Sequence, residues 1–290
     1  TEIYNWLISF FSNRRQQTRF NEGLSDIEEI NCGVVQGSAL GPFTFSVTAS
    51  DLKTKDSRNS ITKYADDTYI LIPGNNLNST DEELQHISQW AKSNNLILNE
   101  GKTKEIILKR PRARDQPPTI PQITRTNTIN ILGVTFSDKL RMHEHIEALI
   151  AHNVKIGYTL KTLRRHGLKG ENLEYIYNAL SHSKTLYACQ SWWSFTTAEE
   201  KQRLAAQVKR SIKFGLCKPS FNLEQEVSKL QGRLFAKIAG NEHHVLKRLL
   251  PMRQDQGHRL RDREINSYSL PVANSYNSKN FITNMLFKFT

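Results

Sequence analysis

Apolar residues in the first half of the chain recur with two different periods. In residues 1–13 and 80–95 they recur every three or four positions, which predicts amphipathic helices. The second of these helices begins with Thr-Asp-Glu-Glu, the spacing of a capping box. A further helix is predicted for residues 43–52, because Pro42 suits the first turn of a helix.

Extended segments lie between these helices. They are short runs rich in Val, Ile, Thr, Tyr and Phe, bounded by Gly, Pro and Asn, a pattern typical of strands. The predicted extended segments are residues 14–20, 63–72, 96–99, 104–109 and 129–136, with loops at residues 31–42 and 111–121.

The second half of the chain has helical periodicity throughout. The predicted helices are residues 142–163, 173–187, 199–214 and 223–249. Residues 266–279 are rich in Asn and Ser, which favours a loosely packed arm. The sequence therefore predicts an α+β fold with a mixed domain at residues 1–138, a helical domain at 139–265 and a C-terminal arm at 266–290.

Charge is divided unevenly between the two halves. The formal net charge is +12 over 290 residues. Residues 1–150 carry 17 basic and 18 acidic side chains, whereas residues 151–290 carry 23 and 10. A basic half joined to a neutral one indicates a polyanion-binding part beside a part with another task. A merely solubilising surface is an equally good explanation of the charge alone.

Cysteine content and hydropathy indicate an intracellular protein of the nucleus or cytoplasm rather than a secreted one. Cys32, Cys189 and Cys217 are far apart and odd in number, which argues against a disulfide framework or a zinc module. Neither a signal peptide nor an apolar run of about 20 residues is visible in the sequence, so no membrane association is expected.

Two adjacent carboxylates, Asp66 and Asp67, interrupt the β-forming segment KYADDTYILI. Asp is depleted in strands because its side chain competes for backbone hydrogen bonds, and neighbouring like charges repel. A turn or a bound cation would account for the pair. The next turn signal, Pro73-Gly74, comes six residues later, which places the aspartates at the opposite end of the strand.

Four motifs around this pair follow one another within about a hundred residues: GVVQGSALGP, YADDT, LNEGKTK and ILGVTF. Their order resembles the palm of reverse transcriptases of non-LTR retrotransposons (LINE elements), nearest the CR1-like group. One YxDD motif is a weak signal, but four blocks in this order are a strong one. The likeness covers about residues 1–140, and the later helices resemble the family's thumb and C-terminal region in pattern only.

This resemblance implies RNA-directed DNA synthesis, with an RNA template, a DNA primer and dNTPs as partners. It also implies a partial palm, an antiparallel sheet with flanking helices, followed by a helical thumb. Asp66 and Asp67 would bind two Mg²⁺ or Mn²⁺ ions about 4 Å apart, one at the primer 3′-hydroxyl and one at the triphosphate. Lys102 matches a lysine that neutralises the leaving pyrophosphate, although a solvent-facing turn lysine is an equal alternative.

Two further motifs match template and primer contacts of the family. Gln36 and Gly37 match a Gln-Gly pair that lies against the template, and glycine permits close backbone approach. Val35 departs from the family, which has Pro before that Gln. Leu132 and Gly133 match the primer-grip hairpin, with a plain buried strand turn as the competing interpretation.

The family's first catalytic aspartate has no counterpart in this sequence. It belongs to a Phe-Asp block that precedes the helix of residues 1–13, and Asp26, Asp51 and Asp138 do not match it. The basic fingers are not matched either. We therefore expect a fragment or truncated copy that is incompetent as a polymerase on its own, because two carboxylates alone compensate little of the charge of two divalent ions.

A catalytically inactive nucleic-acid-binding remnant is the main alternative function, and a helical protein with no specific partner is a weaker third one. The paired histidines at 143/145 and 243/244 lack a third metal ligand, and Trp192-Trp193 fits core packing or base stacking. The expected phosphate-backbone contacts are Lys161, Arg164, Arg165, Lys209, Arg210 and Lys213.

Overall fold

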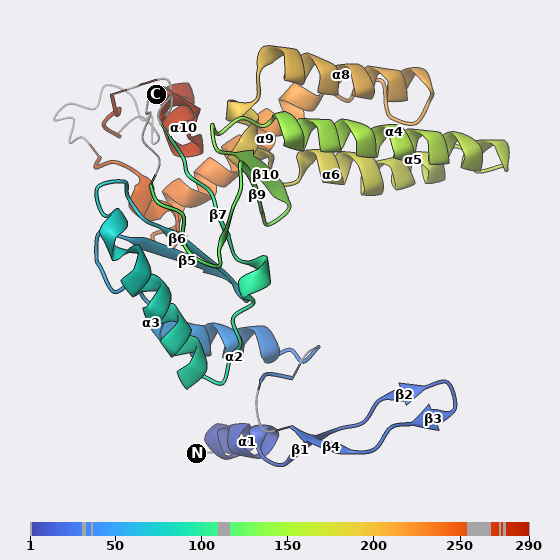
Figure 1. The fold of residues 1–290 in the computed structure, drawn as a ribbon. Helices are drawn as coiled ribbons and strands as arrows, with labels where there is room; N and C mark the ends of the chain where they lie inside the picture. The colour runs from blue at the N-terminus through green and yellow to red at the C-terminus, as the bar shows by residue number, and fades with distance from the viewer. Residues whose placement is uncertain are drawn as a thin grey trace. The chain divides into compact units, whose positions relative to one another are not determined.

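The chain forms two compact units in the computed structural model (Figure 1). The first is drawn from residues 1–103 and 117–123, and the second from residues 104–116 and 124–290. Both contain helices and strands, which confirms the α+β class. The structure describes residues 2–30, 33–35, 37–109, 117–253, 268–272, 274 and 277–289.

The first unit begins with helix α1 (Glu2–Phe11) and a long hairpin. The hairpin pairs β1 (Arg14–Gln16) with β4 (Glu28–Ile30), and β2 (Arg19–Phe20) with β3 (Gly23–Leu24). The segment predicted as one strand at residues 14–20 is thus two short strands on one arm of a hairpin. No residue of α1 is buried among the described residues, so its apolar stripe contributes little to a core.

A second hairpin carries the two adjacent aspartates. Its strands are β5 (Ser60–Tyr64) and β6 (Asp67–Leu71), paired antiparallel from Ser60 opposite Leu71 to Tyr64 opposite Asp67. The segment expected to be a single strand therefore reverses direction within the KYADDTYILI motif. Helix α2 (Gly41–Thr48), with proline in its first turn as predicted, precedes the hairpin, and α3 (Thr80–Ser93) follows it.

The start of α3 corrects the predicted capping box. The N-cap is Ser79, and its side chain makes no capping hydrogen bond. Glu83 instead turns away from the helix start and is 1% exposed. Its carboxylate accepts hydrogen bonds from the backbone N–H groups of Lys55 (3.0 Å) and Asp56 (2.8 Å). Glu83 therefore binds two backbone N–H groups that are distant in sequence instead of the backbone at the start of its own helix.

The second unit begins with two small sheets. Strands β7 (Lys104–Glu105) and β8 (Thr124–Arg125) pair in parallel. Strands β9 (Thr128–Ile131) and β10 (Val134–Ser137) form an antiparallel hairpin, so the segment predicted as one strand at residues 129–136 turns back on itself. In the described residues every sheet has two strands, and a continuous palm sheet stays a prediction.

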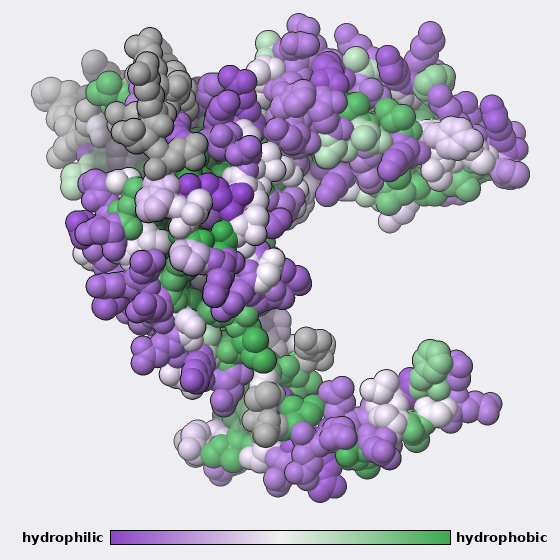
Figure 2. Space-filling view, viewed as in Figure 1, coloured by the Kyte–Doolittle hydropathy of each residue, from purple (hydrophilic) through white to green (hydrophobic). Residues whose placement is uncertain are grey.

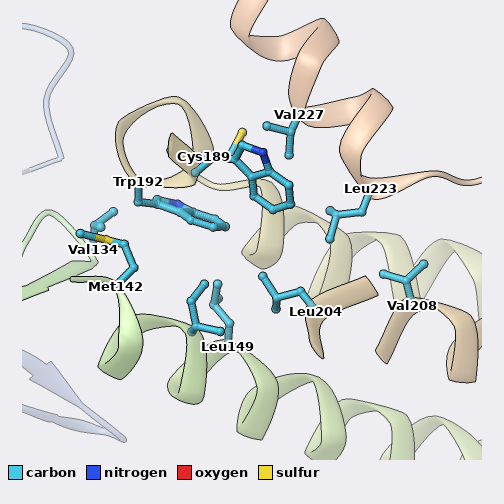
Figure 3. Packing of buried hydrophobic residues seen from close by; sticks show 11 residues of the cluster. Val134, Met142, Leu149, Cys189, Trp192, Leu204, Val208, Leu223 and Val227 are labelled. Atoms are coloured by element: carbon cyan, nitrogen blue, oxygen red, sulfur yellow. The ribbon is translucent and has the colours of Figure 1, made fainter. Parts of the chain in front are cut away.

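Helices make up the rest of the second unit. Buried residues from β10 and four of these helices meet around Trp192 and Cys189, both 0% exposed (Figure 3). Trp192-Trp193 thus belongs to core packing. The helices are α4 (His143–Arg165), α5 (Glu171–Tyr177), α6 (Ser183–Leu186), α7 (Cys189–Trp192), α8 (Ala198–Lys213), α9 (Leu223–Gly240) and α10 (Phe281–Phe289), with a π-helical turn at Asn178–His182.

The C-terminal part of the second unit differs from the sequence expectation. The helix predicted at residues 223–249 ends at Gly240. Helix α10 was not predicted, and its Ile282, Met285 and Leu286 are buried against Phe235 and Ile238 of α9. This end of the expected loose arm is therefore packed against a core helix, whereas residues 254–267 lie outside the described residues.

We predict that Glu83→Ala destabilises the first unit by about 2–4 kcal/mol, because it leaves buried hydrogen-bond donors without an acceptor. Amide hydrogen exchange of β5 and β6 in the intact chain measures this local free energy. Glu82→Ala is the matched control, since Glu82 lies on the same helix in an exposed ion pair with Lys55 (3.1 Å) and should cost less than about 1 kcal/mol. Equal exchange rates in the two variants would contradict the role given to Glu83.

Candidate functional site

The two adjacent aspartates lie at the tip of the β5–β6 hairpin. Ala65 and Asp66 form its two-residue loop, and Asp67 begins β6 opposite Tyr64. Ala65 has a φ of 50°, the left-handed conformation that tight hairpin loops use. Asp66 and Asp67 are both exposed. The aspartates therefore lie at a turn between two strands rather than at one end of a single strand.

Lys63 anchors the hairpin beside this tip. Its ammonium group donates hydrogen bonds to the backbone carbonyls of Ala49 and Leu52, the latter at 2.7 Å, at the end of α2. Burial lowers the pKa of Lys63, and the charge of Asp51 partly opposes this. No sequence motif singles out Lys63. Side chains alternate between the two faces of a strand, so Lys63 lies on the face opposite to the exposed Thr62 and Tyr64. This alternation could have indicated from the sequence that Lys63 points inward.

A buried polar network holds the opposite end of the hairpin. Asn59, just before β5, donates to the Glu83 carboxylate and to Ser79, both at 2.9 Å. Asn76, in the turn after β6, donates to Asn59 at 2.8 Å. Backbone and side-chain donors around Glu83 hold its pKa below the usual value, although burial by itself would raise it. The residues before β5 and after β6 are therefore both connected to α3 at the open end of the hairpin.

The tip offers part of a divalent-metal site. Asp66 and Asp67 supply carboxylate oxygens, the ligands that Mg²⁺ and Mn²⁺ prefer. Tyr69 donates a long hydrogen bond of 3.3 Å to Asp67. Across the described residues, however, no group of three or more His, Cys, Asp or Glu side chains could hold a metal. Asp66 and Asp67 could therefore supply only part of the ligands that Mg²⁺ or Mn²⁺ needs.

Lys102 and Gly37 are two other predicted polymerase residues of the first unit, and both lie outside its strands and long helices. Lys102 is exposed in the short helix Glu100–Lys102, where its backbone N–H donates to Asn99 at 3.1 Å, and no described residue forms an ion pair with it. Gly37 has a φ of 79°, which favours glycine. Gln36 lies outside the described residues. Asp51 accepts a hydrogen bond from Trp90 (2.9 Å), a structural contact between the short helix Ala49–Asp51 and α3.

The predicted primer-grip residues form the tip of the β9–β10 hairpin in the second unit. Leu132 and Gly133 have φ values of 48° and 85°, the two left-handed positions of a type I′ turn. Tyr187, after α6, donates a hydrogen bond to the Leu132 carbonyl at 3.0 Å. A Cβ at residue 133 would lie 3.4 Å from the Tyr187 ring. The turn is thus well defined, and no sequence motif marks Tyr187 as its support.

Two of the six predicted phosphate-contact residues are engaged in packing. Lys161 lies 3.4 Å from the centre of the Phe214 ring, and Arg164 donates to the backbone carbonyl of Phe214. Phe214 is the C-cap of α8, where a cation is favourable because helix carbonyls end there. These two cations therefore connect the ends of α4 and α8.

The other four are exposed and form no ion pair among the described residues. The face of α8 visible in Figure 2 is mostly hydrophilic. These cations are available to a polyanion. They are Arg165 at the end of α4 and Lys209, Arg210 and Lys213 on α8.

His143, His145, Cys189 and Cys217 lie among other contacts in the second unit. His143 lies near Glu200 (3.5 Å), and His145 is 5% exposed with its ring against Trp192. Burial lowers the pKa of His145. Burial also raises the pKa of Cys189 and of Cys217 to about 11, so neither is a ready thiolate. Of the helices that the structure describes, none has the length and apolar character to cross a bilayer.

The chain is similar in sequence to a known protein family and to several known proteins. Residues 2–136 match the family model described as reverse transcriptase (RNA-dependent DNA polymerase). The chain is 24% identical over 202 residues to the probable RNA-directed DNA polymerase from transposon X-element of Drosophila melanogaster. It is 24% identical over 206 residues to the RNA-directed DNA polymerase from mobile element jockey of Drosophila funebris.

The extent of these matches is limited. Each alignment covers 65% of this chain, which spans only 22% of the length of each relative. No solved structure matches the chain. The similarities confirm the predicted resemblance to reverse transcriptases of non-LTR retrotransposons. The match to the family model covers the Asp66–Asp67 hairpin.

We predict that Arg164→Met and Arg165→Met differ in stability, although the two residues are neighbours. Arg164→Met should lower the free energy of unfolding by about 1 kcal/mol, because it removes the donor to the α8 C-cap carbonyl. Arg165→Met should change it by less than about 0.5 kcal/mol. Urea unfolding of the intact chain, followed by tryptophan fluorescence, makes the comparison. Equal losses would show that the Phe214 contact contributes nothing.

Proposed function

We propose, from the match of residues 2–136 to the reverse transcriptase family, that this chain is part of a retrotransposon's RNA-directed DNA polymerase. Its partners would be an RNA template, a DNA primer and dNTPs. The observation that carries the proposal is the hairpin tip, where Asp66 and Asp67 are adjacent, exposed and attached to α2 and α3 through Lys63 and the Glu83 network. Metal ligands need such a rigid support, because small displacements of a catalytic group are costly.

Asp66 and Asp67 would hold the divalent ions of nucleotidyl transfer. Such ions, when bound, lower the pKa of the primer 3′-hydroxyl and neutralise charge on the triphosphate. The role of the protein is to fix the carboxylate oxygens at the turn. A third carboxylate would complete the ligand set, since the described residues supply no third acidic ligand to the turn.

The remaining predicted contacts take supporting roles in this proposal. Lys102 would neutralise the leaving pyrophosphate, and Gln36 with Gly37 would lie against the template. The turn at Leu132 and Gly133 would position the primer end through backbone contacts, with the Tyr187 hydroxyl fixing its carbonyl. The first unit and the β9–β10 hairpin would belong to the palm, and the basic helices to a thumb that contacts the RNA–DNA hybrid.

An inactive nucleic-acid-binding remnant is the second candidate function. It is favoured by the four exposed cations at the end of α4 and on α8, which lie in the half of the chain with 23 basic and 10 acidic residues. These cations would hold the phosphate backbone without any help from Asp66. The two candidate functions are therefore tested by different experiments, one on primer extension and one on nucleic-acid binding.

We predict that the 290-residue chain alone does not extend a primer in Mg²⁺ or Mn²⁺. A fusion that places the family's Phe-Asp block and fingers before Thr1 should extend it, because the metal ligands are then complete. Asp66→Asn in this fusion should abolish extension. Lys102→Ala should slow it by about 10²–10⁴-fold while leaving measurable product. Incorporation of labelled dNTP on an RNA template measures extension by all four proteins.

Asp138→Asn in the same fusion is the control, because Asp138 follows β10 and has no assigned role in the reaction. Its activity should equal that of the parent fusion. Extension by the unmodified 290-residue chain would disprove the need for a third carboxylate. Full activity of the Asp66→Asn fusion would disprove the assignment of the metal site.

We predict that the intact chain binds an RNA–DNA hybrid with a log–log salt slope of about −4, if the four exposed cations each neutralise one phosphate. Arg165→Ala should weaken binding for every sequence and flatten the slope by about one unit, because phosphate contacts carry no sequence information. Fluorescence anisotropy over a series of salt concentrations gives the slope. Lys229→Met, which removes a lysine already paired with Glu226 at 2.7 Å, is the control and should not change it. A slope near zero would show that the four exposed cations do not contact phosphates and serve only solubility.

A further inference from the structure

A polar cavity of about 270 Å³ lies within the second unit, away from the six predicted phosphate-contact residues. Helix α9 lines it with Ser228 and Gln231, and α10 lines it with Lys288. Lys201 of α8 and Lys279, just before α10, complete its basic lining. The cavity is thus lined by the consecutive helices α8 and α9 together with α10, which is distant from them in sequence.

Positive charge is concentrated in this cavity. Three lysines line it against one carboxylate, that of Glu224. Lys201 is half-buried, with its ammonium group 5.1 Å from the centre of the Trp193 ring. Burial lowers the pKa of Lys201, and the charge of Glu224 partly opposes this. An ammonium group kept in a partly dry site favours a counter-ion more strongly than one in open water.

The inner wall of the cavity also holds a hydrogen-bond donor without an acceptor. Gln231 is 4% exposed, and its side-chain Nε2 has no partner among the described residues. Buried polar groups are normally paired, because an unpaired one costs about 1–3 kcal/mol. Near it, Lys288 donates to the Ser228 hydroxyl at 2.6 Å. A ligand with several acceptor oxygens would satisfy the amide and the lysines together.

We propose that this cavity is a binding site for a phosphate group. A phosphate offers multiple acceptor oxygens and up to two negative charges, which match an amide donor and three ammonium groups. A metal cation is disfavoured by the three lysines. The phosphate could come from free inorganic phosphate or from the backbone of a nucleic acid, and both present the same oxygens. The site does not depend on the Asp66–Asp67 turn, so it stands whether or not the chain polymerises DNA.

Binding of inorganic phosphate and of short single-stranded DNA to the intact chain tests this inference by isothermal titration calorimetry at low ionic strength. Lys201→Met should weaken binding of the true ligand about tenfold, and Gln231→Met about threefold, because one removes a charge and the other a neutral donor. Lys237→Met, an exposed lysine of α9 outside the cavity, is the control and should leave the affinity unchanged.

Glu224→Gln should change the affinity in the opposite direction from Lys201→Met. An unfolded protein could not produce such a gain in affinity. Removing this carboxylate should tighten binding about twofold to fivefold. Saturable, Lys201-dependent binding of inorganic phosphate assigns the site to the free ion. Lys201-dependent binding of DNA alone assigns it to backbone phosphates. If neither ligand responds to Lys201→Met and Glu224→Gln, or if Lys237→Met weakens binding equally, the inference is wrong, while the primer-extension result is unaffected.

Discussion

The buried carboxylate of Glu83 is the contact on which the first unit's hairpin depends. It accepts backbone hydrogen bonds from Lys55 and Asp56 and a side-chain hydrogen bond from Asn59, so one charge gathers the segment before β5 onto α3. Asn76 extends the same network to the turn after β6. A buried charge is tolerated only when several donors satisfy it, and here the donors come from segments more than twenty residues away.

This attachment explains how two like charges can remain adjacent at an exposed tip. The cost of repulsion between Asp66 and Asp67 is reduced by water at the tip, while stability comes from the other end of the hairpin and from Lys63. The arrangement separates the part that holds the fold from the part that is available to a ligand. Functional sites commonly combine an exposed, locally unfavourable group with a rigid support elsewhere.

The second unit uses its basic residues in three different ways. Lys161 and Arg164 connect helices through Phe214, Lys201 contributes to a partly buried cavity, and Arg165 remains free at the surface. The net charge of this half therefore overstates the number of cations available to a nucleic acid. Its core forms around Trp192, where β10 and the helices α4, α7, α8 and α9 meet.

Local sequence signals determined most of the helices, the loop before Pro42 and the family resemblance, because periodicity and ordered motifs act over short distances. Tertiary structure alone decided which partner each polar side chain takes. Glu83 left its predicted capping role since backbone donors distant in sequence satisfy it better, and α10 packed because Phe235 and Ile238 present an apolar face to it. Likewise, Arg164 and Arg165 are indistinguishable in the sequence, and only the position of Phe214 separates a structural cation from a free one. Such choices depend on contacts between residues that are remote along the chain, which no local pattern contains.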